Sequence, residues 1–444
     1  MIRCHLGGVL FMGFVLVGGL FNSPSLGAGI SDVQRVISPG GIEAWLVEDH
    51  SVPLIAVDFS FYGGSSQDEP GKEGLSSFVA DLLNEGAGDM PALLFQERLD
   101  DILMHLSFTS GLDWIRGTAK IWKPTLSKAE ELLSSALMEP RFDKDAIDRV
   151  RASRINTLRE NINKPSFIAY NLLREAQYRE HVYGRGLLGT TSSLTSISAE
   201  EIKNYHRRIF AKDRLKISVA GSIDAKSLGP LLDRVFGELP QESDISPIAN
   251  VSAITDFVVA KEADIPQATI LMSLPWLAMD DPDFFASQIL EWVFGRGMSS
   301  RLFREVREKR GLVYHVSASH QDEVHSQTVI ATASTSNSKI SHALLTMKEQ
   351  FAMIAERGVT EDELEIAKTH LRAEPFLYMD TLDGLTNRLM SFQLSNVEID
   401  YVKKWIDMIN KVSLKDVARV ASRLFSKNPG IVIVGKGTEE YKKN

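Results

Sequence analysis

The densest group of side chains that could bind a metal ion lies between residues 315 and 325. It contains His315, His320 and His325, with Asp322 and Glu323 among them. Imidazole and carboxylate groups are common ligands of divalent transition metals. On a strand, however, a spacing of five residues places neighbouring histidines on opposite faces, so the chain would have to fold back to collect them. The pattern favours solvated strand and loop ends, and an autonomous metal site remains the alternative.

A second group that could do chemistry is the pair Arg307 and Tyr314, in the segment RLFREVREKRGLVY at residues 301–314. A guanidinium and a phenol can both donate hydrogen bonds to a peptide carbonyl oxygen. Such donors contribute most when negative charge develops on that oxygen during hydrolysis. Structural roles fit the same residues, because cations stabilise helix C-termini and tyrosine is common in strands.

The elements that would position this pair can be predicted from the same segment. Leu302 and Val306 have helical spacing, which predicts a helix with Arg307 in its last turn. Gly311 stands where a helix C-cap would turn the chain. The following residues, LVYHVSAS, predict a strand that carries Tyr314.

Three residues on another predicted helix, Ser77, Ala80 and Asp81, lie in GKEGLSSFVADLLNEGAG at residues 71–88. Their spacing places them on one helical face. Ser77 is a poor zinc ligand, Ala80 cannot take a proton, and Asp81 alone could hold a metal only weakly. This face therefore offers no general base, and it also fits an ordinary amphipathic helix.

The frame around this helix resembles the pitrilysin/insulinase family of zinc metallopeptidases. Members of that family carry H-x-x-E-H after a Gly-Leu pair, where two histidines bind zinc and the glutamate polarises a water. Ser77, Ala80 and Asp81 occupy the places of the first histidine, the glutamate and the second histidine. The resemblance covers essentially all of the chain after its N-terminal segment. It implies a degenerate zinc motif, with no metal and no catalytic residue of the chain's own.

The resemblance also extends to positions further along the chain. The family's third zinc ligand, a distal glutamate, would fall at Asn156 or Thr157, with Glu160 the nearest carboxylate. His181 lies in a segment similar to the family's H-x-Y-G turn. A single histidine does not make a metal site, so we interpret His181 as structural, with metal ligation as the alternative.

In two-chain, processing-type members of this family, one subunit brings the zinc helix and the other brings an Arg/Tyr pair. The chain resembles the second kind, which implies that Arg307 and Tyr314 bind the substrate. It further implies a homologous zinc-bearing partner subunit, which would hold the zinc, and peptide substrates. Whether the chain is an enzyme by itself stays open, and inactivity alone is expected. The alternative is a non-proteolytic peptide-binding or structural scaffold of the same fold.

Charge and composition narrow the classes of partner. The 444-residue chain has a net charge of −9 and a pI near 5.7. An acidic protein repels polyanions, so we expect neither nucleic acid nor an anionic membrane surface as the main partner.

The N-terminal segment, residues 1–28, is typical of a secretory signal peptide. It has Arg3, an apolar run at residues 7–21, and a small-residue exit at residues 25–28. The run is shorter than the ~20 residues of a spanning helix, so no stable membrane span is expected, although an uncleaved anchor remains the alternative. Cleavage would remove Cys4, the only cysteine, and a periplasmic location fits best.

The pattern of strands and helices after residue 28 predicts an α/β fold. We expect an α+β sandwich of two tandem homologous domains with largely antiparallel sheets. Residues 196–221 and 412–435 each read as a helix capped by Ser198 or Ser413 and followed by a buried strand. We predict a first domain at 29–239, a polar linker at 240–255 and a second domain at 256–444. Residues 41–49 and 52–64 are predicted to pair as a hairpin.

Overall fold

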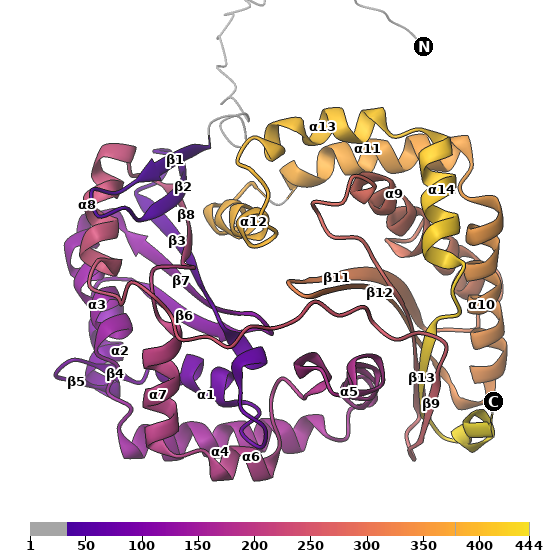
Figure 1. Cartoon of the computed structure of the whole chain (residues 1–444), viewed down its shortest axis with the longest axis horizontal. Helices are drawn as coiled ribbons and strands as arrows, with labels where there is room; N and C mark the ends of the chain where they lie inside the picture. The colour runs from indigo at the N-terminus through magenta and orange to yellow at the C-terminus, as the bar shows by residue number, and fades with distance from the viewer. Residues whose placement is uncertain (1–32, 378, 444) are drawn as a thin grey trace, which may run out of the picture.

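The computed structural model describes residues 33–377 and 379–443, which form two α/β domains, each a sheet with helices packed on it (Figure 1). This confirms the predicted fold class. The predicted signal segment, residues 1–28, lies outside the described residues. Within the described part, no helix has the length and apolar character needed to cross a bilayer.

The N-terminal sheet has six strands in the order β1-β2-β8-β3-β7-β6. All neighbours are antiparallel except β2 and β8. The strands are β1 (Gln34–Ile37), β2 (Glu43–Glu48), β3 (Leu54–Tyr62), β6 (His105–Ser110), β7 (Trp114–Trp122) and β8 (Lys216–Gly221), and β4 (Gly86–Ala87) and β5 (Met90–Pro91) form a separate small pair. The helices of this half are η1 (Gly64–Gln67), α1 (Leu75–Leu82), α2 (Ala92–Asp101), η2 (Lys123–Thr125), α3 (Leu126–Met138), α4 (Lys144–Asn161), α5 (Pro165–Tyr178), η3 (Val182–Gly184), α6 (Thr191–Ser196), α7 (Ala199–Ile209) and α8 (Ala225–Phe236).

The C-terminal sheet has five strands in the order β11-β12-β10-β13-β9. Only β13 and β9 are parallel. The strands are β9 (Val258–Glu262), β10 (Gln267–Pro275), β11 (His315–Glu323), β12 (Ser326–Ser336) and β13 (Gly430–Gly435). The helices of this half are α9 (Phe284–Gly295), η4 (Phe303–Glu308), η5 (Asn337–Lys339), α10 (Ile340–Arg357), α11 (Glu361–Leu377), α12 (Leu382–Leu394), α13 (Tyr401–Lys411), α14 (Leu414–Phe425) and η6 (Thr438–Lys443).

Apart from the additional edge strand β1, the two sheets have the same strand order and directions, as expected for tandem homologous domains. In each, a strand that follows a capped helix, β8 or β13, lies between one parallel and one antiparallel neighbour. The caps are those predicted: Ser198 Oγ accepts from Glu201 N, and Ser413 Oγ accepts from Asp416 N, each at 3.2 Å. Residues 237–257, between α8 and β9, form neither helix nor strand and include the predicted linker.

The predicted hairpin at residues 41–64 is wrong. Strands β2 and β3 form there, but β8 lies between them, parallel to β2 and antiparallel to β3. Every residue of β8 from Ile217 to Gly221 is buried. A strand that is buried on both faces is most stable in the middle of a sheet, so it displaces the local pairing of β2 with β3.

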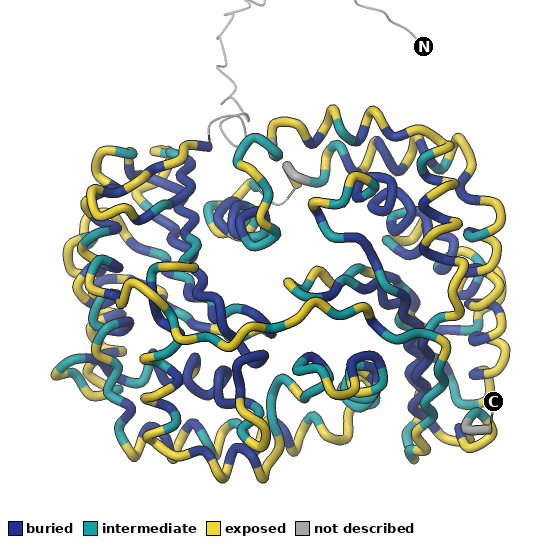
Figure 2. The backbone as a smooth tube through the Cα atoms, viewed as in Figure 1, coloured by how far each residue is buried: buried dark blue, intermediate teal, exposed yellow. Residues whose placement is uncertain are grey.

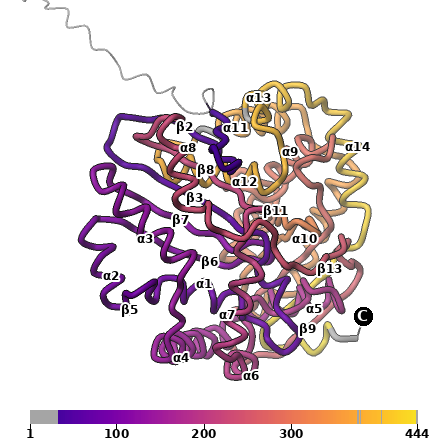
Figure 3. The backbone as a smooth tube through the Cα atoms, turned by 60° about the vertical axis from the view of Figure 1, so that its left-hand side comes forward, coloured from indigo at the N-terminus to yellow at the C-terminus, as the bar shows by residue number. Residues whose placement is uncertain are grey.

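The two domains exchange a helix. Helix α12 of the C-terminal half packs on β8 and β3, while α5 of the N-terminal half packs on β13 and β10. Figures 1 and 3 both show α12 beside the N-terminal sheet and α5 beside the C-terminal sheet. Figure 2 shows the strands mostly buried and the outer helices buried only toward the sheets. The helices α5 and α12 therefore cover the inner face of each sheet with residues of the other domain.

Candidate functional site

The start of α1 is held by a buried carboxylate and a glycine. Asp68 accepts hydrogen bonds from Gly74 N at 2.8 Å and from Ser76 N at 2.9 Å, which satisfies donors at the helix N-terminus. Burial raises the pKa of Asp68 to about 7. Gly74 has a φ of +93°, and a Cβ there would lie 2.8 Å from the carbonyl oxygen of Leu188. These contacts fix the direction of α1 and of the face that holds Ser77.

The three residues of the predicted degenerate motif lie on α1. Ser77 and Ala80 are buried, whereas 44% of the Asp81 side chain is exposed. The hydroxyl of Ser77 is buried without a hydrogen-bond partner. A lone hydroxyl, a methyl group and one carboxylate do not supply the nitrogen and oxygen ligands that a zinc site requires.

A positive charge nevertheless lies at this face. Arg154 reaches over from α4, with its Nε 2.7 Å from Asp81 Oδ2, and one of its Nη atoms donates to the carbonyl oxygen of Ser77. Only 14% of the Arg154 side chain is exposed. Burial lowers the pKa of Arg154 and raises the pKa of Asp81, and the attraction between the two charges opposes both shifts. The carboxylate is therefore already paired with a guanidinium, and the residues here do not fit a zinc ion.

Sequence reasoning missed Arg154. The resemblance placed the distal ligand at Asn156 or Thr157, but both are exposed, as is Glu160. The buried residues Ile147, Val150 and Leu158 mark the face of α4 that packs inward. Arg154 continues that helical spacing, so the periodicity of α4 could have identified it.

The chain turns between Arg307 and Tyr314 in the predicted manner. Gly311 has a φ of +56° and its N–H donates to Arg307 O at 2.9 Å, while Leu312 N donates to Val306 O at 3.0 Å. This pattern of bonds ends the helix and satisfies its last carbonyls. The segment that contains Arg307 is a π-helix rather than an α-helix, and Tyr314 lies one residue before β11 rather than within it.

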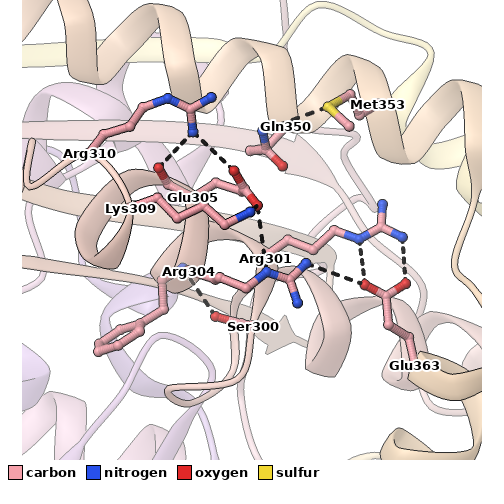
Figure 4. A network of polar contacts seen from close by, with 10 residues as sticks. Ser300, Arg301, Arg304, Glu305, Lys309, Arg310, Gln350, Met353 and Glu363 are labelled. Carbon is pink, nitrogen blue, oxygen red and sulfur yellow. Dashed lines mark hydrogen bonds and ion pairs between the residues drawn. The ribbon is translucent and has the colours of Figure 1, made fainter.

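Arg307 differs from four nearby cations, whose contacts with carboxylates Figure 4 shows. Arg301 forms a bidentate pair with Glu363, at 2.9 and 2.6 Å, and Arg304, Lys309 and Arg310 have carboxylate partners within 4.0 Å, which are Glu305 and Glu363. Among the described residues, Arg307 has no carboxylate partner. Its guanidinium lies over the ring of Phe303, 4.7 Å from the centroid.

Tyr314 is also available to a ligand. The residue is 58% exposed, and its hydroxyl makes no hydrogen bond within the part of the chain that the structure describes. Its backbone N–H donates to Ser334 O at 2.8 Å, which anchors the residue to β12. Arg307 and Tyr314 thus have fixed backbones and unpaired donors.

The histidines of the segment 315–325 have separate partners. His315 contacts Ser317 at 3.1 Å, His320 contacts Glu291 at 2.5 Å, and His325 contacts Tyr62 at 2.6 Å. In the described ranges, no three His, Cys, Asp or Glu side chains are placed to hold a metal ion together. His181 Nδ1 accepts from Tyr183 N at 3.2 Å and caps η3, which agrees with the structural interpretation.

The chain is similar to known proteins along most of its length. Residues 45–191 match the family model described as Insulinase (Peptidase family M16), and residues 196–371 match the model described as Peptidase M16 inactive domain. An uncharacterized zinc protease of Streptomyces coelicolor is 23% identical over 92% of this chain and 90% of its own length. The non-peptidase homolog YmxG of Helicobacter pylori is 23% identical over 83% of this chain and 86% of its own.

Solved structures show the same fold. A peptidase M16 inactive domain from Pseudomonas fluorescens superposes with a TM-score of 0.85 at 20% identity, covering 91% of this chain and 98% of that one. A protease from Helicobacter pylori superposes with a TM-score of 0.83 at 16% identity, covering 91% and 99%. This chain belongs to peptidase family M16, the insulinase family, as a member whose zinc-motif helix lacks the metal ligands.

Proposed function

We propose that this protein is the exported, zinc-free subunit of a two-chain metallopeptidase. Its partner is a homologous subunit with an intact H-x-x-E-H helix, which holds the zinc. This chain supplies Arg307 and Tyr314, which bind the peptide and stabilise the oxyanion during hydrolysis. The N-terminal segment directs the protein to the periplasm.

The ion pair between Asp81 and Arg154 is the observation that carries this proposal. A carboxylate at 2.7 Å from a mostly buried guanidinium is not available as a base or as a ligand. Ala80 has no group that could accept a proton from water. Without a base and a metal the chain lacks the means to activate water, so hydrolysis has to come from a partner.

The second support is that the side chains of Arg307 and Tyr314 are accessible to a substrate. Both side chains are exposed and neither has a charged partner in the described part of the chain. The four cations near it in the chain have carboxylate partners, whereas the guanidinium of Arg307 lies over the ring of Phe303 and has no carboxylate partner among the described residues. A guanidinium and a phenol in this state can donate to a substrate carbonyl without first breaking an ion pair.

The test is reconstitution with the zinc-bearing homologue. We expect peptide hydrolysis only in the mixture. Arg307→Ala and Tyr314→Phe should each lower kcat/KM of the mixture by about 10²-fold or more without changing assembly, because each removes one transition-state donor. Arg310→Ala is the matched control, since Arg310 is paired with Glu305 at 3.1 Å and should leave turnover near the wild-type value.

Two outcomes would contradict the proposal. Hydrolysis by this chain alone, retained after metal removal and zinc resupply and abolished by Asp81→Asn, would assign it an active site of its own. Unchanged turnover in both the Arg307→Ala and the Tyr314→Phe mixtures would mean that the chain acts only as a scaffold.

A further inference from the structure

A groove of about 790 Å³ lies beside α10 and α14, the helices on the outer side of the C-terminal sheet (Figure 1). It is bounded by the second half of α10, the end of α14 and the start of β9. Its floor is formed by the buried apolar side chains of Phe351, Phe425 and Ile431, and half-buried Phe257 and Val258 form one wall. A concave apolar surface of this size suits a row of apolar side chains from a ligand.

The internal repeat identifies the corresponding place in the N-terminal domain. Strands β13 and β9 pair in parallel, as β8 and β2 do. Helix α14 precedes β13 as α7 precedes β8, and α10 follows β12 as α3 follows β7. The N-terminal counterpart of the groove is therefore bounded by α3, the end of α7 and the start of β2.

In the N-terminal domain, helix α8 fills this place. It follows β8 and packs on α3, and Phe236 of α8 lies in one core cluster with Leu137 of α3. Lys212, which follows α7, donates its N–H to Pro240 O at 2.9 Å and its Nζ to Gly237 O at 2.9 Å. These bonds join the end of α8 to the end of α7, so the counterpart of the groove is covered by the chain itself.

In the C-terminal domain, the chain after β13 takes a different course. The hydroxyl of Tyr441 in η6 contacts Ser341 Oγ, at the start of α10. The N–H groups of Gly437 and Thr438 donate to Glu262, at the end of β9, at 3.0 and 2.9 Å. The groove lies instead beside the second half of α10 and the start of β9. Within residues 33–377 and 379–443, no helix of this domain takes the place that α8 holds in the other.

The charges on the rim of the groove are not balanced. Lys348 and Lys427 line it, are exposed, and have no carboxylate partner among the described residues. Asp256 and Glu356, the acidic residues of the rim, each have a donor or a cation nearby within the chain. Two lysines are therefore available to carboxylates of a ligand.

The contact between α8 and α3 indicates how such charges are used. Arg234 of α8 forms a bidentate pair with Glu130 of α3, at 2.6 and 2.9 Å. There the outer helix brings the cation and α3 brings the carboxylate. At the groove the signs are reversed, because α10 brings Lys348, so the complementary group on the ligand is a carboxylate.

We propose that this groove binds an acidic amphipathic helix of another protein, in the place that α8 takes in the N-terminal domain. Helix-in-groove recognition uses apolar side chains at i, i+3, i+4 and i+7. Helix α8 shows this spacing at its buried residues Leu228, Leu231, Leu232 and Val235. In the described chain the outer helices turn their buried faces toward the chain's own sheets (Figure 2), so a second copy would have to unfold to supply such a helix.

Fluorescence anisotropy with a labelled helical peptide tests the groove in the full-length protein. The probe is a side-chain-stapled helix with leucines at i, i+3, i+4 and i+7 and glutamates on both flanks of that face. We expect saturable binding with a Kd below about 100 μM. Ala352→Arg should weaken binding about tenfold or more, because Ala352 lines the groove on α10 and the arginine would occupy the space that the leucines need. Ala152→Arg, at an exposed alanine of α4, is the matched control and should bind as the wild type does.

An exchange of charge tests the chemistry of the ligand. Lys348→Glu should weaken the glutamate probe about threefold or more, and it should strengthen a probe that carries lysines instead of the glutamates. A loss of folding would weaken both probes, so the reversal of preference is specific to the groove. Urea unfolding midpoints equal to that of the wild type confirm that each variant is folded.

Any of three results would overturn the inference. One is the absence of saturable binding of the glutamate probe up to about 1 mM. Another is equal binding in the wild type and Ala352→Arg, or equal preference between the two probes in the wild type and Lys348→Glu. The third is self-association of the protein that Ala352→Arg abolishes in sedimentation, which would assign the groove to a second copy. None of these measurements depends on peptide hydrolysis or on a zinc-bearing subunit.

Discussion

At the scale of single residues, the face of α1 that corresponds to the zinc motif lies against a positive charge, although its three side chains do not make a zinc site. A zinc helix packs its face around a dication, and here the guanidinium of Arg154 lies between Asp81 and the carbonyl of Ser77. The mostly buried charge of Arg154 requires a partner, because an unpaired charge in a protein interior is costly. Asp81 is thus part of the structure of this helix pair rather than a remnant of the metal site.

Removal of one partner of this pair should destabilise the protein. We expect Asp81→Asn to lower the free energy of unfolding by about 1–3 kcal/mol, less than for a fully buried pair because the Asp81 carboxylate is half-exposed and screened by solvent. The double variant Asp81→Asn/Arg154→Met should recover part of that loss, since it leaves no unpaired charge. Urea unfolding of the two single variants and the double variant measures the coupling. Strictly additive effects would mean that the two residues do not interact.

The absence of zinc ligands at this site could be predicted from the sequence, whereas the ion pair with Arg154 could not. Ser77, Ala80 and Asp81 could be recognised because a motif assigns a chemical role to each place, and a missing imidazole is visible in the printed sequence. Arg154 belongs to no motif, and its role depends on how α4 packs against α1. The lack of a carboxylate partner for Arg307 could not be predicted either, because it depends on Glu305 and Glu363 pairing with other cations of the same segment.

At the scale of elements, α1 is positioned by contacts at its N-terminus, and none of these contacts requires a metal ion. Gly74 and Asp68 still direct α1, and the start of α1 lies so close to the segment before α6 that a Cβ at Gly74 would be 2.8 Å from Leu188 O. Because the backbone at Gly74 has a positive φ, only glycine adopts it without strain. The helix is held at its N-terminus by tertiary contacts that do not involve its metal-ligand positions.

A pair of glycine substitutions separates close packing from backbone strain. Gly71 and Gly74 have φ values of +83° and +93°, but a Cβ at Gly71 meets nothing within 4 Å. We expect Gly71→Ala to cost about 1 kcal/mol from strain alone, and Gly74→Ala to cost about 2 kcal/mol or more because the Leu188 carbonyl must also move. The midpoints of urea unfolding give both values. Equal losses in the two variants would show that the Leu188 contact does not constrain α1.

Element prediction succeeded where the signal was local and failed where it depended on long-range pairing. The capping residues Ser198 and Ser413 mark α7 and α14 because a cap satisfies donors within its own helix. The hairpin of β2 and β3 was wrong because β8, more than 150 residues further along the chain, is the better neighbour for both strands. Nothing in residues 41–64 indicates that a third strand will separate them.

At the scale of the whole molecule, the exchange of α5 and α12 makes each domain dependent on the other. Leu173 of α5 packs with Leu271 and Val432 of the C-terminal sheet, and Leu389 of α12 lies in a cluster with Trp45 and Val47 of the N-terminal sheet. If the domains separated, both sheets would expose an apolar inner face to water, which is unfavourable in proportion to the area exposed. The tandem repeat predicted from the sequence is therefore one structural unit.

Unfolding should accordingly be a single transition, even though the chain has two sheets and two main cores. We expect urea unfolding curves from circular dichroism and tryptophan fluorescence to coincide, and Leu173→Ala and Leu389→Ala each to lower the stability of the whole transition by about 2–5 kcal/mol. Leu133→Ala, in the core of the N-terminal half alone, is the control and should shift the same single transition. Independent domains would give two transitions, of which Leu133→Ala moves only one. In that case α5 and α12 would add contact area between the domains without coupling their unfolding. The two helices couple the domains only if the unfolding of one domain disrupts the core of the other.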